Sequence, residues 1–389
     1  MSQRKLKKRK KVQANGNSRK NALNFLVSAT ASIPLFGLST PVFAQHPPES
    51  TTTGIQYSYF EDWQAGNKER MSIHAPMAWV DTAIGSNTEL EASFVFDSMT
   101  GASPIYHDTL SGASGLGIED KRYAGDITVT QYFEDFSLSL GGAYSTEDDY
   151  DSQGINFSTR FWSPDRNTVY MFGANTNYNQ ITSVNSPLLD ETQTDFGAIA
   201  GITQILDKDS LIQSNFSVEI EDGYLSDPYK LSDNRPQSRD RYAWLTRYVR
   251  YISSTDAALH LDYRFYFDSW RLFSHTMDLS WYQPFGKDDT WMLRPRIRYY
   301  SQREANFYSD LDPVDVTDDS IYSADQRLGS YGSFTFGLGL THDFGGGYLA
   351  SASYDFAITN SGWVLGTQGS PDIENLYLSY FSINLEKRF

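Results

Sequence analysis

The sequence predicts an all-β protein: a single transmembrane antiparallel β-barrel of about 16 strands. Three observations predict this fold. Apolar and polar residues alternate with a period of two, as in strands with one apolar face. The alternating segments mostly reach the ~9–11 residues that a tilted strand needs to cross a bilayer. Short and long connections alternate along the chain, as short periplasmic turns and long external loops do in bacterial barrels.

The alternation is clearest in residues 136–145, 212–220, 257–267 and 334–341. A one-sided soluble sheet gives the same pattern, but soluble strands average only about five or six residues. The length of the segments therefore favours the membrane barrel. We expect strands near 54–63, 71–82, 88–100, 123–133, 136–147, 153–162, 168–177, 192–205, 210–221, 240–252, 257–267, 273–283, 291–301, 332–343, 347–358 and 379–389.

The lengths of the connections distinguish the two ends of the expected barrel. Tight turns are expected at 85–87, 134–135, 163–165, 207–209, 253–255, 285–289 and 345–346. Long connections are expected at 101–122, 178–191, 222–239, 302–331 and 359–378. Both chain ends then lie on the side of the tight turns, which requires an even number of strands.

Tryptophans near strand ends are expected to form the aromatic girdles at the two membrane interfaces. Trp79, Trp162, Trp281 and Trp291 fall at ends that the topology makes periplasmic, and Trp63 falls at an external end. The tryptophan positions therefore agree with the barrel, and ordinary aromatic residues in strands are the alternative.

The last expected strand is amphipathic and ends in an aromatic residue. Phe381, Ile383, Leu385 and Phe389 share one face, and Lys387 lies on that same apolar face. Its long stem allows the amine to reach the headgroups. Outer-membrane barrels are similar, because their assembly machinery recognises a final strand with a C-terminal phenylalanine. We therefore expect the barrel assembly machinery as a partner.

Residues 1–44 are expected to form a signal peptide, which leaves 45–389 as one barrel domain. A basic stretch without acidic residues precedes an apolar run at 25–43, and Val42 and Ala44 suit cleavage before Gln45. An uncleaved membrane anchor is disfavoured because polar residues and Pro34 interrupt the run. The expected location is the bacterial outer membrane after export.

Composition excludes several classes of site and partner. The chain has no cysteine, so it has no disulfide, thiolate metal site or cysteine nucleophile. Its net charge of −16 becomes more negative once the basic leader is removed, which argues against nucleic-acid binding. Outer-membrane lipid and lipopolysaccharide are the expected surroundings. Neither the six histidines nor the acidic loop 302–331 has metal-site spacing, so no metal or cofactor is expected.

Basic residues on the polar face of the expected strands are candidates for the wall of the lumen. Three arginines alternate with apolar residues along 293–298, and others lie on strands further away. Acidic residues of loops 101–122 or 302–331 facing such a row would form a charged constriction, as in general porins. Pairing with wall carboxylates such as Asp262, Asp278, Glu219 and Asp355 is the favoured alternative. The lumen-facing candidates are Arg160, His260, Arg264, Arg294, Arg296 and Arg298.

The loop 104–115 contains His107, Asp108 and Ser111, which suggests a hydrolase. A catalytic triad depends on rigid geometry, and adjacent histidine and aspartate side chains usually point apart. We therefore expect no enzyme activity and no catalytic residue. A glycine-rich loop that folds back into the lumen is favoured, with His107 and Asp108 as loop-site candidates.

Two loops, 101–122 and 223–239, resemble those of the domain-of-unknown-function 3570 family of exported bacterial barrels. The resemblance covers nearly all of the chain after the leader. It implies the barrel fold and the outer membrane, and it implies no activity or cofactor. Because the loops are more distinctive than the wall, Tyr229, Lys230, Arg235 and Arg239 are further loop-site candidates. Loop packing is the favoured alternative for these four.

The expected function follows from the size of the barrel. With about 16 strands the lumen is wide enough for water unless loops plug it. Passage of small polar or ionic solutes is therefore the leading hypothesis. The alternative is a plugged barrel that acts as a receptor, gated transporter or assembly partner through its external loops, and a membrane-embedded hydrolase is less favoured.

Overall fold

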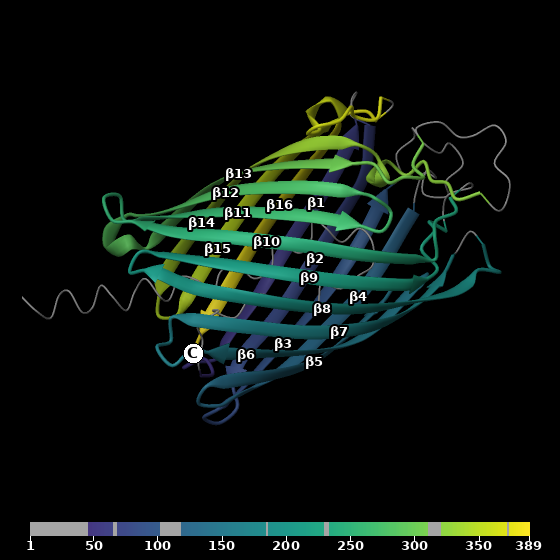
Figure 1. Cartoon of the computed structure of the whole chain (residues 1–389). Coiled ribbons are helices and arrows are strands. Elements are labelled where there is room, and N and C mark those ends of the chain that lie inside the picture. Colours follow the sequence, from purple (N-terminus) through teal and green to yellow (C-terminus); the bar gives the residue numbers. More distant parts are fainter. Residues whose placement is uncertain are drawn as a thin grey trace, which may run out of the picture.

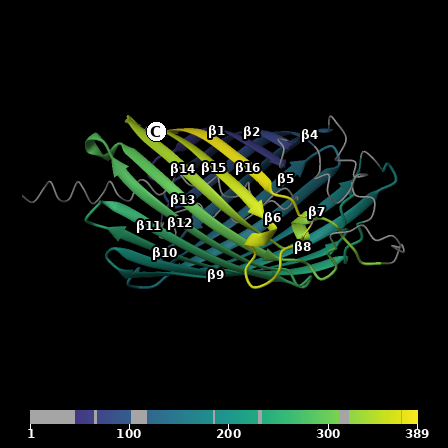
Figure 2. The same ribbon diagram turned by 90° about the horizontal axis from the view of Figure 1, so that it is seen from above.

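Sixteen strands pair in chain order and close into one antiparallel barrel (Figure 1). The structure is a computed structural model that describes residues 46–64, 68–101, 118–183, 186–228, 233–309, 320–371 and 373–389. The first strand, β1, closes the barrel by pairing with the last, β16. The C-terminus lies at the end of the barrel that carries the tight turns (Figure 1, Figure 2). Among the described residues, no helix is long and apolar enough to span a membrane.

The strands are β1 (Thr52–Gln64), β2 (Lys68–Ala83), β3 (Thr88–Gly101), β4 (Ile118–Tyr132), β5 (Phe136–Thr146), β6 (Tyr150–Trp162), β7 (Thr168–Thr182), β8 (Asp190–Asp207), β9 (Ser210–Gly223), β10 (Ser238–Ile252), β11 (Ala257–Asp268), β12 (Phe273–Phe285), β13 (Trp291–Arg303), β14 (Tyr331–Gly345), β15 (Tyr348–Asn360) and β16 (Leu376–Arg388). Single 3-10 turns lie at η4 (Lys287–Asp289), η5 (Gln326–Leu328) and η6 (Ser361–Trp363).

The predicted fold class and strand number are confirmed. Several strands run further toward the long-loop end than the alternation indicated: β4 begins at Ile118 rather than 123, and β7 ends at Thr182 rather than 177. The apolar pattern fades where a strand leaves the membrane, but the ladder of backbone hydrogen bonds continues beyond that point. Hydropathy therefore underestimates the length of these strands.

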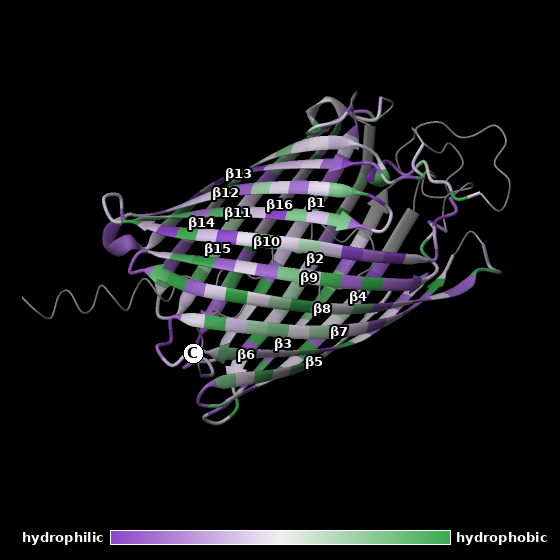
Figure 3. Ribbon diagram, viewed as in Figure 1, coloured by the Kyte–Doolittle hydropathy of each residue, from purple (hydrophilic) through white to green (hydrophobic). Residues whose placement is uncertain are grey.

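The two faces of the wall differ in polarity, as the alternating colours along each strand show (Figure 3). In β1, Ile55 is 60% exposed on the outer face, whereas Gln56 and Ser58 are 8% and 2% exposed on the inner face. Direct partners on neighbouring strands point to the same side, so the inner face of the whole barrel follows from the register. It carries mainly hydroxyl, amide and charged side chains.

Aromatic residues gather on the outer face near the tight turns. The Trp291 ring stacks on His342 with 4.0 Å between ring centroids. The side chain of Lys387 starts on the apolar face and ends in polar contacts at the neighbouring turn. Its Nζ donates to the carbonyl oxygen of Gly346 at 2.7 Å and lies 3.8 Å from the centre of the Tyr348 ring. The long stem crosses apolar surface and delivers the amine to the turn.

The assignment of Trp79 and Trp162 to a membrane girdle was wrong. Trp79 shares the inner face with Asp81, and its ring covers the backbone of Gly54 on β1, where a side chain would collide with it. Trp162 is 5% exposed and packs inside with Tyr132. A position near a strand end tells where a side chain lies along the barrel axis. The phase of the alternation decides whether it lies on the inner or the outer face.

Candidate functional site

The six lumen candidates lie on the inner face of the wall. Arg160 on β6 pairs directly with the buried Ser137, and His260 on β11 pairs with the buried Ser280. The other four candidates also occupy inward positions of their strands. On β13 these positions alternate with outward ones such as Ile297, which is 39% exposed. They are Arg264 on β11 and Arg294, Arg296 and Arg298 on β13.

Arg296 is the most enclosed of these groups, with only 3% of its side chain exposed. Its Nε and Nη2 donate to Asp278 Oδ2 at 2.8 and 2.6 Å, and its Nη1 donates to Asp355 Oδ1 at 3.2 Å. Arg298 donates to the same Asp278 oxygen from Nε at 2.9 Å. One guanidinium therefore joins β13 to β12 on one side and, across β14, to β15 on the other.

A second ion pair extends this network to β10. Arg247 donates from Nε and Nη2 to the two oxygens of Asp262 at 2.8 and 2.6 Å. Direct pairing places Arg298, Asp278, Asp262 and Arg247 side by side across four strands. Sequence reasoning overlooked Arg247, although its phase on β10 would have identified it as an inward residue.

Arg264 and Arg294 differ from their neighbours, since within the described part of the chain neither forms an ion pair with a carboxylate. The Arg264 guanidinium lies 5.3 Å from the centre of the Tyr266 ring, a cation–π contact. Arg294 lies against Gly339, where a methyl group would be 3.0 Å from its Nε. Both side chains thus rest on the wall with their charge uncompensated by a bound carboxylate.

Carboxylates gather on the inner face of β2 and β3, near the tight-turn end. Single oxygens of Asp81, Glu89 and Glu91 lie within 4.8 Å of one another, the one such group among the described residues that has the geometry for a metal ion. The Tyr132 hydroxyl donates to Glu89 at 2.5 Å. Carboxylate oxygens of this kind suit hard cations such as Ca²⁺. No spacing pattern in the sequence indicates this group, because strand pairing assembles it.

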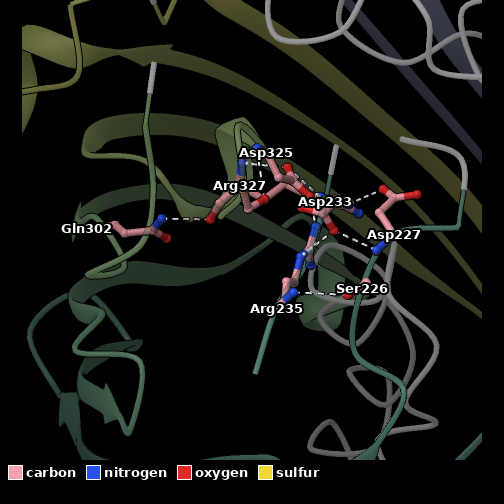
Figure 4. Close-up of polar contacts among 8 residues, drawn as sticks. Ser226, Asp227, Asp233, Arg235, Gln302, Asp325 and Arg327 are labelled. Atoms are coloured by element: carbon pink, nitrogen blue, oxygen red, sulfur yellow. Dashed lines mark hydrogen bonds and ion pairs between the residues drawn. The ribbon is translucent and has the colours of Figure 1, made fainter. Parts of the chain in front are cut away.

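The external loops after β9 and β13 are joined by a cluster of ion pairs (Figure 4). Arg235, which is 9% exposed, donates from Nη2 to Asp325 Oδ2 at 2.8 Å, and its Nε lies 2.7 Å from Asp233 Oδ2. Arg327 binds Asp325 and reaches Asp227 Oδ2 at 3.0 Å. We call these five residues the loop clasp. It holds together segments about ninety positions apart in sequence.

Electrostatics in the clasp favour the charged form of Arg327. Burial alone would lower the pKa of its guanidinium, but Asp325, followed by Asp227 and Asp233, outweighs burial and holds that pKa above its ordinary value. The pKa of the nearby Tyr224 is raised by burial and by Asp233 and Asp227. The clasp is therefore a permanently charged arginine site among carboxylates.

Arg239 contacts a small apolar core that includes Leu328, the chain neighbour of Arg327 in the clasp. It donates from Nε and Nη2 to Asp268 Oδ2 at 3.0 and 2.6 Å, and its guanidinium lies 4.1 Å from the centre of the Trp270 ring. Trp270 packs with the buried Leu272 and Leu328. Of the loop-site candidates, Arg235 thus joins two loops in the clasp, and Arg239 joins Asp268 to the neighbouring apolar core.

The remaining loop candidates, His107, Asp108, Tyr229 and Lys230, lie outside the described residues, as do Ser111 and the leader 1–44. The expectation that the chain is not an enzyme therefore stays a prediction. Asp325 belongs to the acidic loop 302–331 that was considered as a partner of the lumen arginines, and it binds Arg235 and Arg327 of the clasp instead. Asp233 was not singled out from the sequence.

Comparison with known proteins gives a family and a fold. The model of a family described as "Protein of unknown function (DUF3570)" matches residues 106–191 and 185–357. No curated protein matches the chain.

Solved structures match the barrel at low sequence identity. A "bacterial polysaccharide outer membrane secretin" matches with a TM-score of 0.50 and 10% identity, over 87% of this chain and 98% of that chain. CdiB from Acinetobacter baumannii matches with a TM-score of 0.50 and 9% identity, over 86% of this chain and 60% of that one. The outer membrane protein opdK from Pseudomonas aeruginosa matches with a TM-score of 0.44 and 7% identity, over 88% and 100%. At these identities the likeness shows the fold alone.

Proposed function

Since the chain belongs to the DUF3570 family, whose function is unknown, and has the fold of bacterial outer-membrane barrels, we propose that it is an outer-membrane channel for small polar or ionic solutes. One observation carries this proposal. The inner wall of a closed sixteen-strand barrel is lined by polar side chains, and barrels of this strand number enclose an aqueous channel.

The distribution of side chains over the two faces supports passage of polar solutes. Inner positions that are at least partly exposed, such as Asp126, Asn156 and Asn175, offer carboxylate and amide groups, whereas outer positions such as Ile55 and Leu140 suit lipid. A dry core would need well-packed apolar side chains inside. Instead, the apolar clusters of the described residues are small and lie at the ends of the wall.

Swelling of liposomes tests the proposal directly. Refolded protein in vesicles should admit arabinose and small salts, so that the vesicles swell when these solutes replace an impermeant one outside. Vesicles with the same protein inserted but stachyose outside serve as the control for leakage. Failure of every small solute to enter vesicles that contain folded barrel contradicts the channel.

A second candidate function is binding at the external loops, and the loop clasp favours it. Arg235, Asp325 and Arg327 join the described parts of two long loops, and a binding surface requires a defined structure of this kind. In that case the barrel serves as the anchor of a receptor or gated transporter. Vesicles that stay impermeable to every solute would favour this candidate over the channel.

A further inference from the structure

Arginines on the inner wall form a continuous track between the two ends of the barrel. Arg294, Arg296 and Arg298 occupy successive inward positions of β13, which are about 7 Å apart. Arg264 on β11 pairs with Thr276 on β12, which pairs with Tyr300 on β13. Tyr300 is the next inward residue after Arg298, so Arg264 lies one inward step further toward the long loops than Arg298.

The track continues on β10 toward the end of the barrel with the long loops. Asp268 lies two inward positions beyond Arg264 on β11, and Arg241 on β10 pairs directly with it. Arg239 is the next inward residue of β10 in the same direction. No interval along this path exceeds about 14 Å, roughly two inward steps of a strand. Guanidinium groups therefore follow one another along the whole length of this wall.

The charges of opposite walls have opposite signs. Among the described side chains, the inner face of β10–β13 carries seven arginines and three aspartates, whereas that of β2–β4 carries five carboxylates and one arginine. Three more carboxylates, Glu219 and Glu221 on β9 and Asp355 on β15, pair with arginines of the first wall and leave it with a small positive excess. In a ring of sixteen strands, β3 lies opposite β11, eight strands away in either direction. The carboxylate wall repels an anion toward the arginine wall, because charges of one sign focus ions of the other in a narrow aqueous space.

We propose that the lumen conducts small oxyanions, carboxylates or phosphates, along this arginine track, with Arg294 and Arg264 as the two positions where the anion binds. This inference rests on the proposed channel function. The other five arginines already bind carboxylates, so they shape the field without offering a complete site. Arg296 and Arg298 bind Asp278, Arg247 binds Asp262, Arg241 binds Glu219 and Glu221, and Arg239 binds Asp268. Arg294 and Arg264 form no such pair within the described chain, and a guanidinium binds a planar oxyanion through two parallel donors.

Gly337 and Gly339 on β14 leave space for the side chains of Arg296 and Arg294. At Gly337 a methyl group would collide with Asp355, which holds Arg296, and at Gly339 it would press on Arg294. The absence of side chains at these positions lets both arginines lie flat against the wall. The lower part of the track thus depends on two residues with no charge of their own.

Reversal potentials under a KCl gradient in planar bilayers test the selectivity. Wild-type channels should prefer chloride to potassium, and Arg294→Gln and Arg264→Gln should each reduce that preference by about twofold, as expected for removing one charge several ångströms from the ion path. Arg250→Gln is the matched control: Arg250 lies on β10 with the opposite phase and pairs with Asp207 outside the lumen. It should leave the selectivity unchanged.

Block of the chloride current tests binding and separates the two sources of oxyanion. Succinate and inorganic phosphate are added separately, and the stronger blocker names the preferred class. Block that weakens in Arg294→Gln and, to a smaller extent, in Arg294→Lys supports a guanidinium site, since lysine keeps the charge but not the paired donors. Open channels that prefer cations, or that neither probe blocks, overturn the inference and leave the channel standing. Folded barrels without any conductance overturn both.

Discussion

At the scale of single residues, the inner wall is held by ion pairs whose partners come from different strands. Arg296 shows how much of this is readable in advance. Its phase in the sequence was enough to place it inside, and pairing with wall carboxylates was the favoured interpretation. The choice of Asp278 and Asp355 depends on the register of four strands, which no local pattern contains.

Arg296→Met should destabilise the barrel by about 3–5 kcal/mol, because it leaves Asp355 as a buried charge without its guanidinium. Unfolding by urea in lipid vesicles measures this change. Arg250→Met is the control, since the exposed pair with Asp207 contributes at most about 1 kcal/mol. Equal losses in the two variants would show that the Arg296 network does not hold the wall.

At the scale of elements, the alternation predicted the strands well and the loops poorly. Each strand has one apolar face toward lipid, so its residues report their own phase. The loop clasp has no such periodicity: Arg235 meets Asp325 only because the barrel brings the two loops together. Trp79 and Trp162 were misplaced for a different reason, because they were assigned from their positions near strand ends and not from their phase in the alternation.

The turn between β14 and β15 contains two glycines that differ in one respect. Gly346 and Gly347 have φ of +62° and +84°, but only at Gly347 would a methyl group collide with a backbone atom, the carbonyl oxygen of Arg388. Gly346→Ala should cost about 1 kcal/mol, the cost of the left-handed conformation. Gly347→Ala should cost clearly more. Similar urea midpoints for the two variants would contradict a close approach of β16 to this turn.

The loop clasp should open independently of the barrel. Arg235→Leu removes the guanidinium that joins Asp325 to Asp233. Limited proteolysis should then cut the loops between β9 and β10 or between β13 and β14 faster, while thermal unfolding of the strands changes little. Arg271→Leu is the control, because Arg271 lies in the neighbouring β11–β12 loop and has no ion pair within the described chain. Unchanged cleavage in Arg235→Leu would mean that the apolar core around Trp270 alone holds the loops.

At the scale of the whole molecule, closure turns a local alternation into a polar lumen with two charged walls. The sequence predicted the closed barrel and about sixteen strands for two reasons. The thickness of the bilayer sets the strand length, and the two sides of the membrane differ in the length of their connections. It did not predict that the carboxylates of β2–β4 face the arginines of β10–β13, since this opposition arises only when β1 pairs with β16. The loops that would narrow the lumen are likewise set by tertiary packing.

The central claim is that this lumen is an open aqueous passage, and single-channel conductance of the refolded protein in a planar bilayer tests it most directly. We expect steady unitary currents that rise in proportion to voltage and salt concentration, from samples whose circular dichroism shows folded β structure. Bilayers that stay silent with correctly folded barrel inserted would contradict the claim, and would assign the chain to the loop-binding function instead.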